Sequence, residues 1–167
     1  MYKPKYFGLE ELVWESIYKE LHDKGMLWVL WRRFDDRFLI TIDQFREDFG
    51  STLINNWSFV DRSWLPNQKF EFSGARPYVI PKGQKWSLYT THAFWDTADL
   101  KVKKYASYSR ADKIIAYNEA RRYILSNPDK YKYVTVLESG EYAPTWVHTS
   151  TCNFRLQNGN VRVVKPK

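Results

Sequence analysis

The sequence contains a single cysteine, Cys152, and only three histidines in 167 residues. One cysteine excludes an intrachain disulfide, and it also excludes a zinc site built from several thiolates and a CxxC redox pair. No apolar run approaches the roughly 18 residues that indicate a membrane-spanning helix. The N-terminal segment MYKPKYFGLEEL lacks the apolar centre of a secretion signal. We therefore expect a chain that is made in the cytoplasm of its host cell and has no membrane span.

The sequence also lacks a continuous basic block, although its formal net charge is +7 and its pI about 9.4. Lys and Arg form only short clusters, at 101–104 and 121–122. We expect these clusters to lie on solvated helix and loop faces, and a nucleic-acid groove is the less favoured alternative. The charge favours anionic partners such as nucleic acid, teichoic acid, lipopolysaccharide or an anionic membrane, without indicating a specific nucleic acid.

Aromatic residues, in contrast, are abundant, at 18% of the chain with eight Trp and twelve Tyr. A chain of this length buries roughly two-thirds of the surface that its unfolded form exposes. No internal repeat, linker or low-complexity tract divides it. We therefore predict one α+β domain over residues 1–167, with a small antiparallel sheet and flanking helices.

Apolar residues at spacings of three and four predict three helices. The first covers 7–24, the second follows an N-cap at Asp35 or Asp36 and ends near Phe49, and the third runs from a capping box at Ser109 to about Ser126. The third helix is expected to turn the following side chains inward: Ile114, Ile115, Ala120, Tyr123 and Ile124. The apolar run at 26–34 fits either a buried strand or a helix.

β-branched and aromatic residues predict short strands. They are expected at 52–57, 100–102, 133–137 and 145–149, followed by a hairpin over 154–164 that turns at Asn158-Gly159. The polar segment 58–69 is expected to be a surface loop.

Two histidines and one aspartate form the candidate site. His92 and Asp99 lie seven residues apart, and His148 follows far downstream in the strand-like run TWVHTS. Two imidazoles and a carboxylate are a ligand set that holds a catalytic zinc ion with a fourth position open for water. Zinc lowers the pKa of such a water to roughly 7, which supplies hydroxide at neutral pH. The spacing alone is common in proteins, so the neighbouring residues carry the assignment.

Three segments together resemble the signature of the M15-type zinc peptidases, the family of D-Ala-D-Ala carboxypeptidases and phage endolysins. The segment 90–99 has the sequence TTHAFWDTAD and resembles the family pattern S-x-H-x-x-G-x-A-x-D. SGAR at 73–76 resembles the preceding S-G-x-R segment, and WVH at 146–148 resembles the W-x-H segment that carries the last ligand. The similarity extends over about 36–149 and is greatest to small phage-encoded members. It implies the fold shared by Hedgehog proteins and D-Ala-D-Ala peptidases.

The resemblance implies a role for each matching residue. His92, Asp99 and His148 would bind Zn²⁺. Arg76 would pair with a substrate carboxylate or stabilise the oxyanion of the tetrahedral intermediate. Ser73 and Thr90 would contact the substrate, Thr90 standing at the position of the family's serine.

The signature departs from the family pattern at three positions. Trp95 replaces a glycine, Thr97 replaces an alanine, and Thr145 stands where many members have the catalytic carboxylate. Glu138 is the preferred replacement for that general base because it ends the strand-like run YVTVLE, and Glu141 is the other candidate.

Two functions follow from the resemblance. The first is a phage- or prophage-encoded zinc peptidase that hydrolyses an amide bond in the peptide stem of peptidoglycan, during lysis or cell-wall penetration. The second is a catalytically impaired relative that serves as a phage virion protein or wall-binding module, with other virion proteins as partners. The altered signature is the reason to keep the second alternative.

Overall fold

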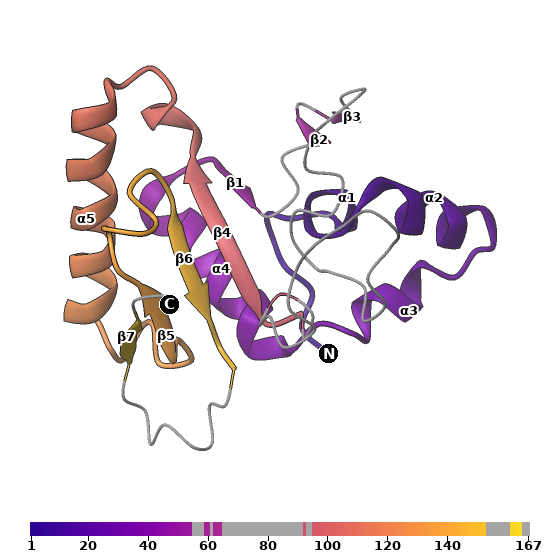
Figure 1. Ribbon diagram of the computed structural model, residues 1–167. Coiled ribbons are helices and arrows are strands. Elements are labelled where there is room, and N and C mark those ends of the chain that lie inside the picture. The colour runs from indigo at the N-terminus through magenta and orange to yellow at the C-terminus, as the bar shows by residue number, and fades with distance from the viewer. Residues whose placement is uncertain (55–58, 61, 65–91, 93–94, 153–160, 165–167) are drawn as a thin grey trace.

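The computed structural model of the chain describes residues 1–54, 59–60, 62–64, 92, 95–152 and 161–164 (Figure 1). It is a small α+β fold with helices and an open five-stranded sheet. The helices are α1 (Leu9–Leu12), α2 (Glu15–Asp23), α3 (Leu27–Trp31), α4 (Asp36–Phe49) and α5 (Arg110–Ser126), with a 3₁₀ turn η2 (Lys103–Tyr105). The sheet consists of β1 (Thr52–Ile54), β4 (Thr97–Val102), β6 (Val147–Ser150), β5 (Val136–Glu138) and β7 (Arg162–Val164), in that order.

The sheet is mostly antiparallel, as the sequence predicts. β1, β4, β6 and β5 pair antiparallel, whereas β7 pairs parallel with β5. A predicted hairpin partner of β7 and its Asn158-Gly159 turn lie outside the described residues. The segment 58–69 is not wholly loop, because β2 (Phe59–Val60) and β3 (Ser63–Trp64) form a separate two-stranded hairpin.

Helices α4 and α5 begin at the caps that the sequence predicts. The Asp35 side chain accepts a hydrogen bond from the Arg37 amide, and the Ser109 hydroxyl accepts one from the Asp112 amide. Gly50 ends α4 with a φ of 86°, a left-handed conformation that glycine adopts without the steric penalty of a Cβ. Local hydrogen bonding therefore sets the ends of both long helices.

The predicted helix over 7–24 is wrong in one respect, because it is broken between α1 and α2. Val13 and Trp14 are extended, and Leu12, Val13 and Trp14 are 0%, 0% and 8% exposed. Three consecutive residues point in directions about 100° apart in a helix and so cannot all face one core. The extended break buries all three. The open alternative at 26–34 is resolved as the short helix α3.

The inward face predicted for α5 is only partly correct. Ala120 and Ile124 are buried, but Ile115 and Tyr123 are 55% and 41% exposed. The buried stripe of α5 consists instead of Ala116, Tyr117, Ala120, Arg121 and Ile124. An arginine lies at the centre of this stripe, and apolar periodicity cannot indicate such a position.

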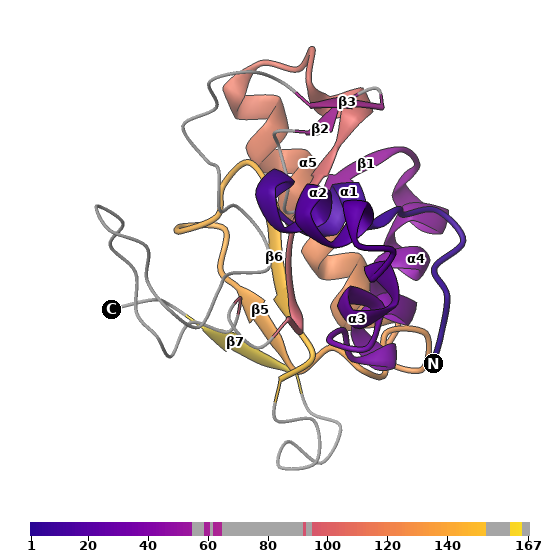
Figure 2. The same ribbon diagram turned by 90° about the vertical axis from the view of Figure 1, so that its right-hand side faces the viewer.

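Helices α4 and α5 cover the same face of the sheet (Figures 1 and 2). Their buried side chains share one core with Leu100 and Val147, which point to this face from β4 and β6. Helices α1 to α3 lie beyond the β1 edge (Figure 1). Among the described residues, no helix combines the length and the apolar character needed to cross a membrane.

Trp95 joins the N-terminal helices to the start of β4. Its ring centroid lies 5.0 Å from that of Phe34 and 6.1 Å from that of Trp14, and the residue is 7% exposed. Its φ is 61°, in the left-handed region that non-glycine residues rarely adopt. Aromatic packing therefore holds a backbone conformation that costs roughly 1–2 kcal/mol for an L-residue with a Cβ.

This conflict between packing and backbone predicts an unusual order of stabilities at position 95. Both Trp95→Ala and Trp95→Gly are expected to lose about 3–5 kcal/mol of unfolding free energy, because a large buried side chain is removed. Trp95→Gly is expected to be about 1 kcal/mol more stable than Trp95→Ala, because glycine adopts positive φ readily. Urea denaturation of the two variants measures the difference. The usual order, with alanine more stable than glycine, would contradict the strain at this residue.

Candidate metal centre

Strand pairing places Asp99 and His148 directly opposite each other. Asp99 on β4 is the register partner of His148 on β6. The Nδ1 atom of His148 lies 2.7 Å from Oδ1 of Asp99. Directly opposed side chains on an antiparallel pair have Cβ atoms about 5 Å apart, close enough for this contact. Two of the three residues predicted to be metal ligands are therefore adjacent because of the sheet alone.

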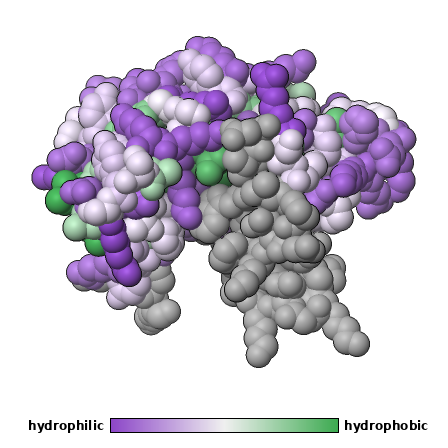
Figure 3. Space-filling view, turned by 90° about the horizontal axis from the view of Figure 1, so that it is seen from above, coloured by the Kyte–Doolittle hydropathy of each residue, from purple (hydrophilic) through white to green (hydrophobic). Residues whose placement is uncertain are grey.

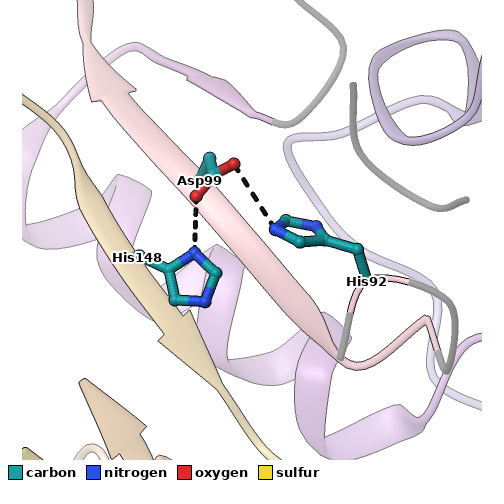
Figure 4. Close-up of side chains that lie close together, drawn as sticks. All are labelled: His92, Asp99 and His148. Atoms are coloured by element: carbon teal, nitrogen blue, oxygen red, sulfur yellow. Dashed lines mark hydrogen bonds and ion pairs between the residues drawn. The ribbon is translucent and has the colours of Figure 1, made fainter. Parts of the chain in front are cut away.

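The alternation of β4 turns Asp99 away from the core. Ala98 and Leu100, which flank Asp99, are fully buried against the helices, whereas the Asp99 side chain is 20% exposed. Successive side chains of a strand point to opposite faces. The site thus lies on the sheet face that α4 and α5 do not cover, with α4 behind the strands in Figure 4.

His92 completes the cluster from the segment before β4 (Figure 4). Its Nε2 atom lies 3.5 Å from Oδ2 of Asp99, and its ring centroid lies 5.2 Å from that of His148. The side chain is 5% exposed. The Trp95 amide donates a hydrogen bond to the His92 carbonyl at 3.4 Å, which ties His92 to the residue two positions before β4. The Asp99 carboxylate therefore lies between the two imidazoles, with one oxygen directed at each.

These three side chains could hold a metal ion. One donor atom from each lies within 4.8 Å of the other two. Ligand atoms of a tetrahedral zinc site, with bonds of about 2.0–2.1 Å, lie roughly 3.3 Å apart, so small side-chain rotations are sufficient. Imidazole and carboxylate donors without a thiolate are suited to zinc among the common metals. The donor set and its geometry are therefore those of a group that could hold a metal ion.

Comparisons of the chain with protein-family models, with curated proteins and with solved structures find no match. The chemistry of the site therefore rests on its own residues.

A hydroxyl and carboxyl cluster adjoins the candidate metal ligands. Thr97 and Ser150 are the pair of register partners two positions along from Asp99 and His148, and their hydroxyls lie 2.9 Å apart. The Thr97 hydroxyl also donates to Oδ1 of Asp96 at 3.1 Å. Burial raises the pKa of the Asp96 carboxyl to about 6, an effect that the Thr97 hydroxyl opposes and the Asp35 carboxylate reinforces. Sequence patterns did not indicate Asp96, because it carries no motif of its own.

Glu138 is better placed than Glu141 to act at the cluster. Leu137 of β5 is the partner of Thr149, and both are buried, so Glu138 points to the same face as His148. Burial raises the pKa of Glu138; the positive potential of His148 opposes this rise, and Asp99 adds to it. Glu141 is exposed and lies in the loop between β5 and β6. The two candidate bases therefore differ in position, with Glu138 on the sheet face of His148 and Glu141 in the loop.

Arg121 holds the backbone at the end of β5 and in the loop before β6. Its Nε donates to the Glu138 carbonyl at 2.9 Å, and its Nη2 donates to the carbonyls of Ala143 and Trp146. Arg121 is 6% exposed, so the expectation that the 121–122 cluster is solvated holds for Arg122 alone. Three carbonyls and a buried guanidinium satisfy one another. Arg121 thereby ties α5 to the end of β5 and the start of β6.

Three further residues implied by the resemblance, Ser73, Arg76 and Thr90, lie outside the described residues. The structure brings together His92, Asp99 and His148, and it places Glu138 beside them. Arg121 and Asp96 are additions that the sequence did not reveal. Their burial results from contacts between segments distant in the chain.

The raised pKa of Asp96 predicts a pH-dependent contribution to stability. Because the pKa of Asp96 in the folded state, about 6, exceeds the ordinary aspartate value of 3.8, ionisation of Asp96 opposes folding as pH rises between these two values. The expected loss is on the order of 2–3 kcal/mol. Asp96→Asn should remove this loss and so gain stability relative to the wild type between about pH 4 and 7.

Urea denaturation across this pH range measures the difference between the two proteins. Asp23→Asn is a matched control, because the Asp23 side chain is 81% exposed. Parallel stability profiles for the wild type and Asp96→Asn would contradict the raised pKa.

Proposed function

We propose that this chain is a zinc-dependent peptidase that hydrolyses an amide bond in the peptide stem of peptidoglycan. The observation that carries the proposal is the grouping of His92, Asp99 and His148 on one sheet face, with donor atoms within 4.8 Å of one another. These are the residues at the ligand positions of the M15-type signature that the sequence resembles. The resemblance extends the proposal to a Hedgehog- and D-Ala-D-Ala-peptidase-like fold.

Two departures from the signature are compatible with this geometry. Trp95 stands where the family has glycine, and its φ of 61° is the backbone conformation that glycine favours. Thr97 stands where the family has alanine, and its hydroxyl has a partner in Ser150 at 2.9 Å. The backbone at Trp95 thus has the conformation that a glycine at this position would allow, with the tryptophan ring packed into the core.

A bound zinc ion would supply Lewis-acid chemistry, polarising a carbonyl and making water nucleophilic near neutral pH. Glu138 would accept the proton of that water and deliver it to the leaving amine. Its raised pKa suits this exchange, because a general base is most effective when its pKa lies near the working pH. In this proposal Arg76, Ser73 and Thr90 hold the substrate.

The proposed setting is a phage or prophage. The chain would be made in the host cytoplasm and act on the cell wall, in lysis or penetration, and the virion is a further place where it could act beside other phage proteins. Its net charge of +7 would favour approach to an anionic wall.

The second candidate is a catalytically impaired relative that serves as a virion or wall-binding protein. Thr145 favours it, because this residue occupies the position of the catalytic carboxylate and cannot accept a proton at neutral pH. The two candidates differ in whether Glu138 replaces that carboxylate.

Metal content tests the site itself. Protein purified without added metal is expected to contain about one zinc per chain by elemental analysis, and His148→Ala and His92→Ala are expected to lose most of it. His22→Ala is the matched control, because His22 is 60% exposed on α2 and belongs to no metal-binding cluster of the described residues. A wild-type protein that takes up no zinc even after its addition would contradict the metal centre.

Digestion of purified peptidoglycan tests the chemistry. Glu138→Gln is expected to keep its zinc and to lose about two to four orders of magnitude in hydrolysis rate, because the proton acceptor is removed. Glu119→Gln is the control, since its side chain is 64% exposed on α5. A comparable loss in Glu141→Gln alone would assign the base to Glu141. Zinc binding without any hydrolysis by the wild type would favour the non-catalytic candidate.

A further inference from the structure

A groove of about 1010 Å³ opens where β4 ends and α5 begins. Its walls are β4, the turn η2, the first turns of α5 and the loop 139–146 between β5 and β6. We call it the basic groove because its described lining includes four basic residues: Lys101, Lys103, Arg110 and Lys113. Tyr142 and Trp146 also line it. Figure 3 looks onto this end of the molecule, where hydrophilic residues cover most of the described surface.

Cations dominate the lining of the groove. Among the described residues of the lining, four carry a positive charge and Glu141 alone carries a negative charge. Like charges gathered in one concavity repel one another and concentrate positive potential there. An anionic occupant relieves this repulsion. The groove is therefore suited to a ligand with more than one negative group.

The basic groove adjoins the metal cluster along the same two strands. Lys101 lies two residues after Asp99 on β4, and Trp146 lies two residues before His148. Residues two apart on a strand share a face and are about 7 Å apart. Lys101 Nζ lies 5.9 Å from the Trp146 ring centroid, which continues the cross-strand register. Lys101 and Trp146 thus bring one side of the groove onto the sheet face that carries the metal cluster.

The rest of the lining indicates an organic ligand instead of a simple ion. Tyr142 is 45% exposed and Trp146 is half-buried, so both present aromatic surface beside the cations. A volume of this size exceeds what an isolated anion needs and matches a drug-sized molecule or a short peptide. Backbone and apolar side chains of a peptide can pack on the rings while its carboxylates contact the cations.

We propose that the basic groove binds the carboxylate-bearing part of the substrate and holds an acidic peptide beside the metal cluster. The role of this peptide as substrate rests on the proposed peptidase function. Its binding rests on the charge and position of the groove alone. Arg110 and Lys113 are the residues to alter, because both lie in the first turns of α5 and neither is buried.

Calorimetric titration with a glutamate hexapeptide tests binding independently of catalysis. The double variant Arg110→Gln with Lys113→Gln is expected to bind about tenfold more weakly than the wild type, and added salt should weaken wild-type binding. The control is Lys19→Gln with Lys24→Gln, called the α2 variant, which removes the same charge from exposed positions on α2 and at its C-cap. His148→Ala should bind the hexapeptide as the wild type does. Equal weakening by the α2 variant, or no binding by the wild type, would overturn the proposal.

Two further measurements distinguish the alternatives. An oligothymidylate of six nucleotides that binds tenfold more tightly than the hexapeptide would make the groove a nucleic-acid site and overturn the proposal. In peptidoglycan digestion, the groove variant is expected to raise KM about tenfold at unchanged kcat. Hydrolysis with an unchanged KM would overturn the groove's role in substrate binding. Hexapeptide binding without hydrolysis by any variant would support the groove while rejecting the peptidase.

Discussion

The antiparallel pairing of β4 with β6 is the constraint on which the candidate site depends. It sets Asp99 opposite His148, and it sets Leu100 opposite Val147 on the other face. A slip of one residue would turn every side chain of a strand to the opposite face. His148 would then enter the core and Val147 would leave it, at a cost of roughly 1.5–3 kcal/mol for the exposed apolar side chain alone. Apolar packing beneath the sheet therefore holds the polar cluster above it in register.

A buried arginine extends this control to the surroundings of the site. Arg121 donates to carbonyls at the end of β5 and at the start of β6, from a helix on the other face. A buried guanidinium is costly when it lacks partners, so a displacement of these carbonyls from Arg121 would destabilise α5 as well as the loop. Gly140 lies close to Asn118, which accepts from Arg121, and a Cβ at Gly140 would come within 2.1 Å of the Asn118 amide oxygen. The loop that forms one wall of the basic groove is thus fitted closely to α5.

The three residues of the candidate site could be named from the sequence because the segments that contain them resemble a known signature. Their proximity could not be derived that way, since His148 lies 49 residues from Asp99 and only the sheet brings them together. Asp96 and Arg121 escaped prediction because a charged residue at an unremarkable position is ordinarily exposed. Their burial results from packing between segments that are distant in the sequence, and no periodic sequence pattern indicates such packing. Glu138 was preferred over Glu141 from its place in a strand-like run, and it lies at the end of β5 on the sheet face of His148.

The sequence by itself determined the features that depend on neighbours a few residues away. Caps at Asp35 and Ser109 and the glycine stop at Gly50 locate the long helices, because each acts through local backbone hydrogen bonds or local sterics. Tertiary structure decided the break at Val13, the buried face of α5 and the parallel pairing of β7 with β5. In each case the core or a distant strand supplies the deciding contact. Burial against such partners outweighs helix propensities of a few tenths of a kcal/mol per residue, so local pattern alone could not indicate the outcome.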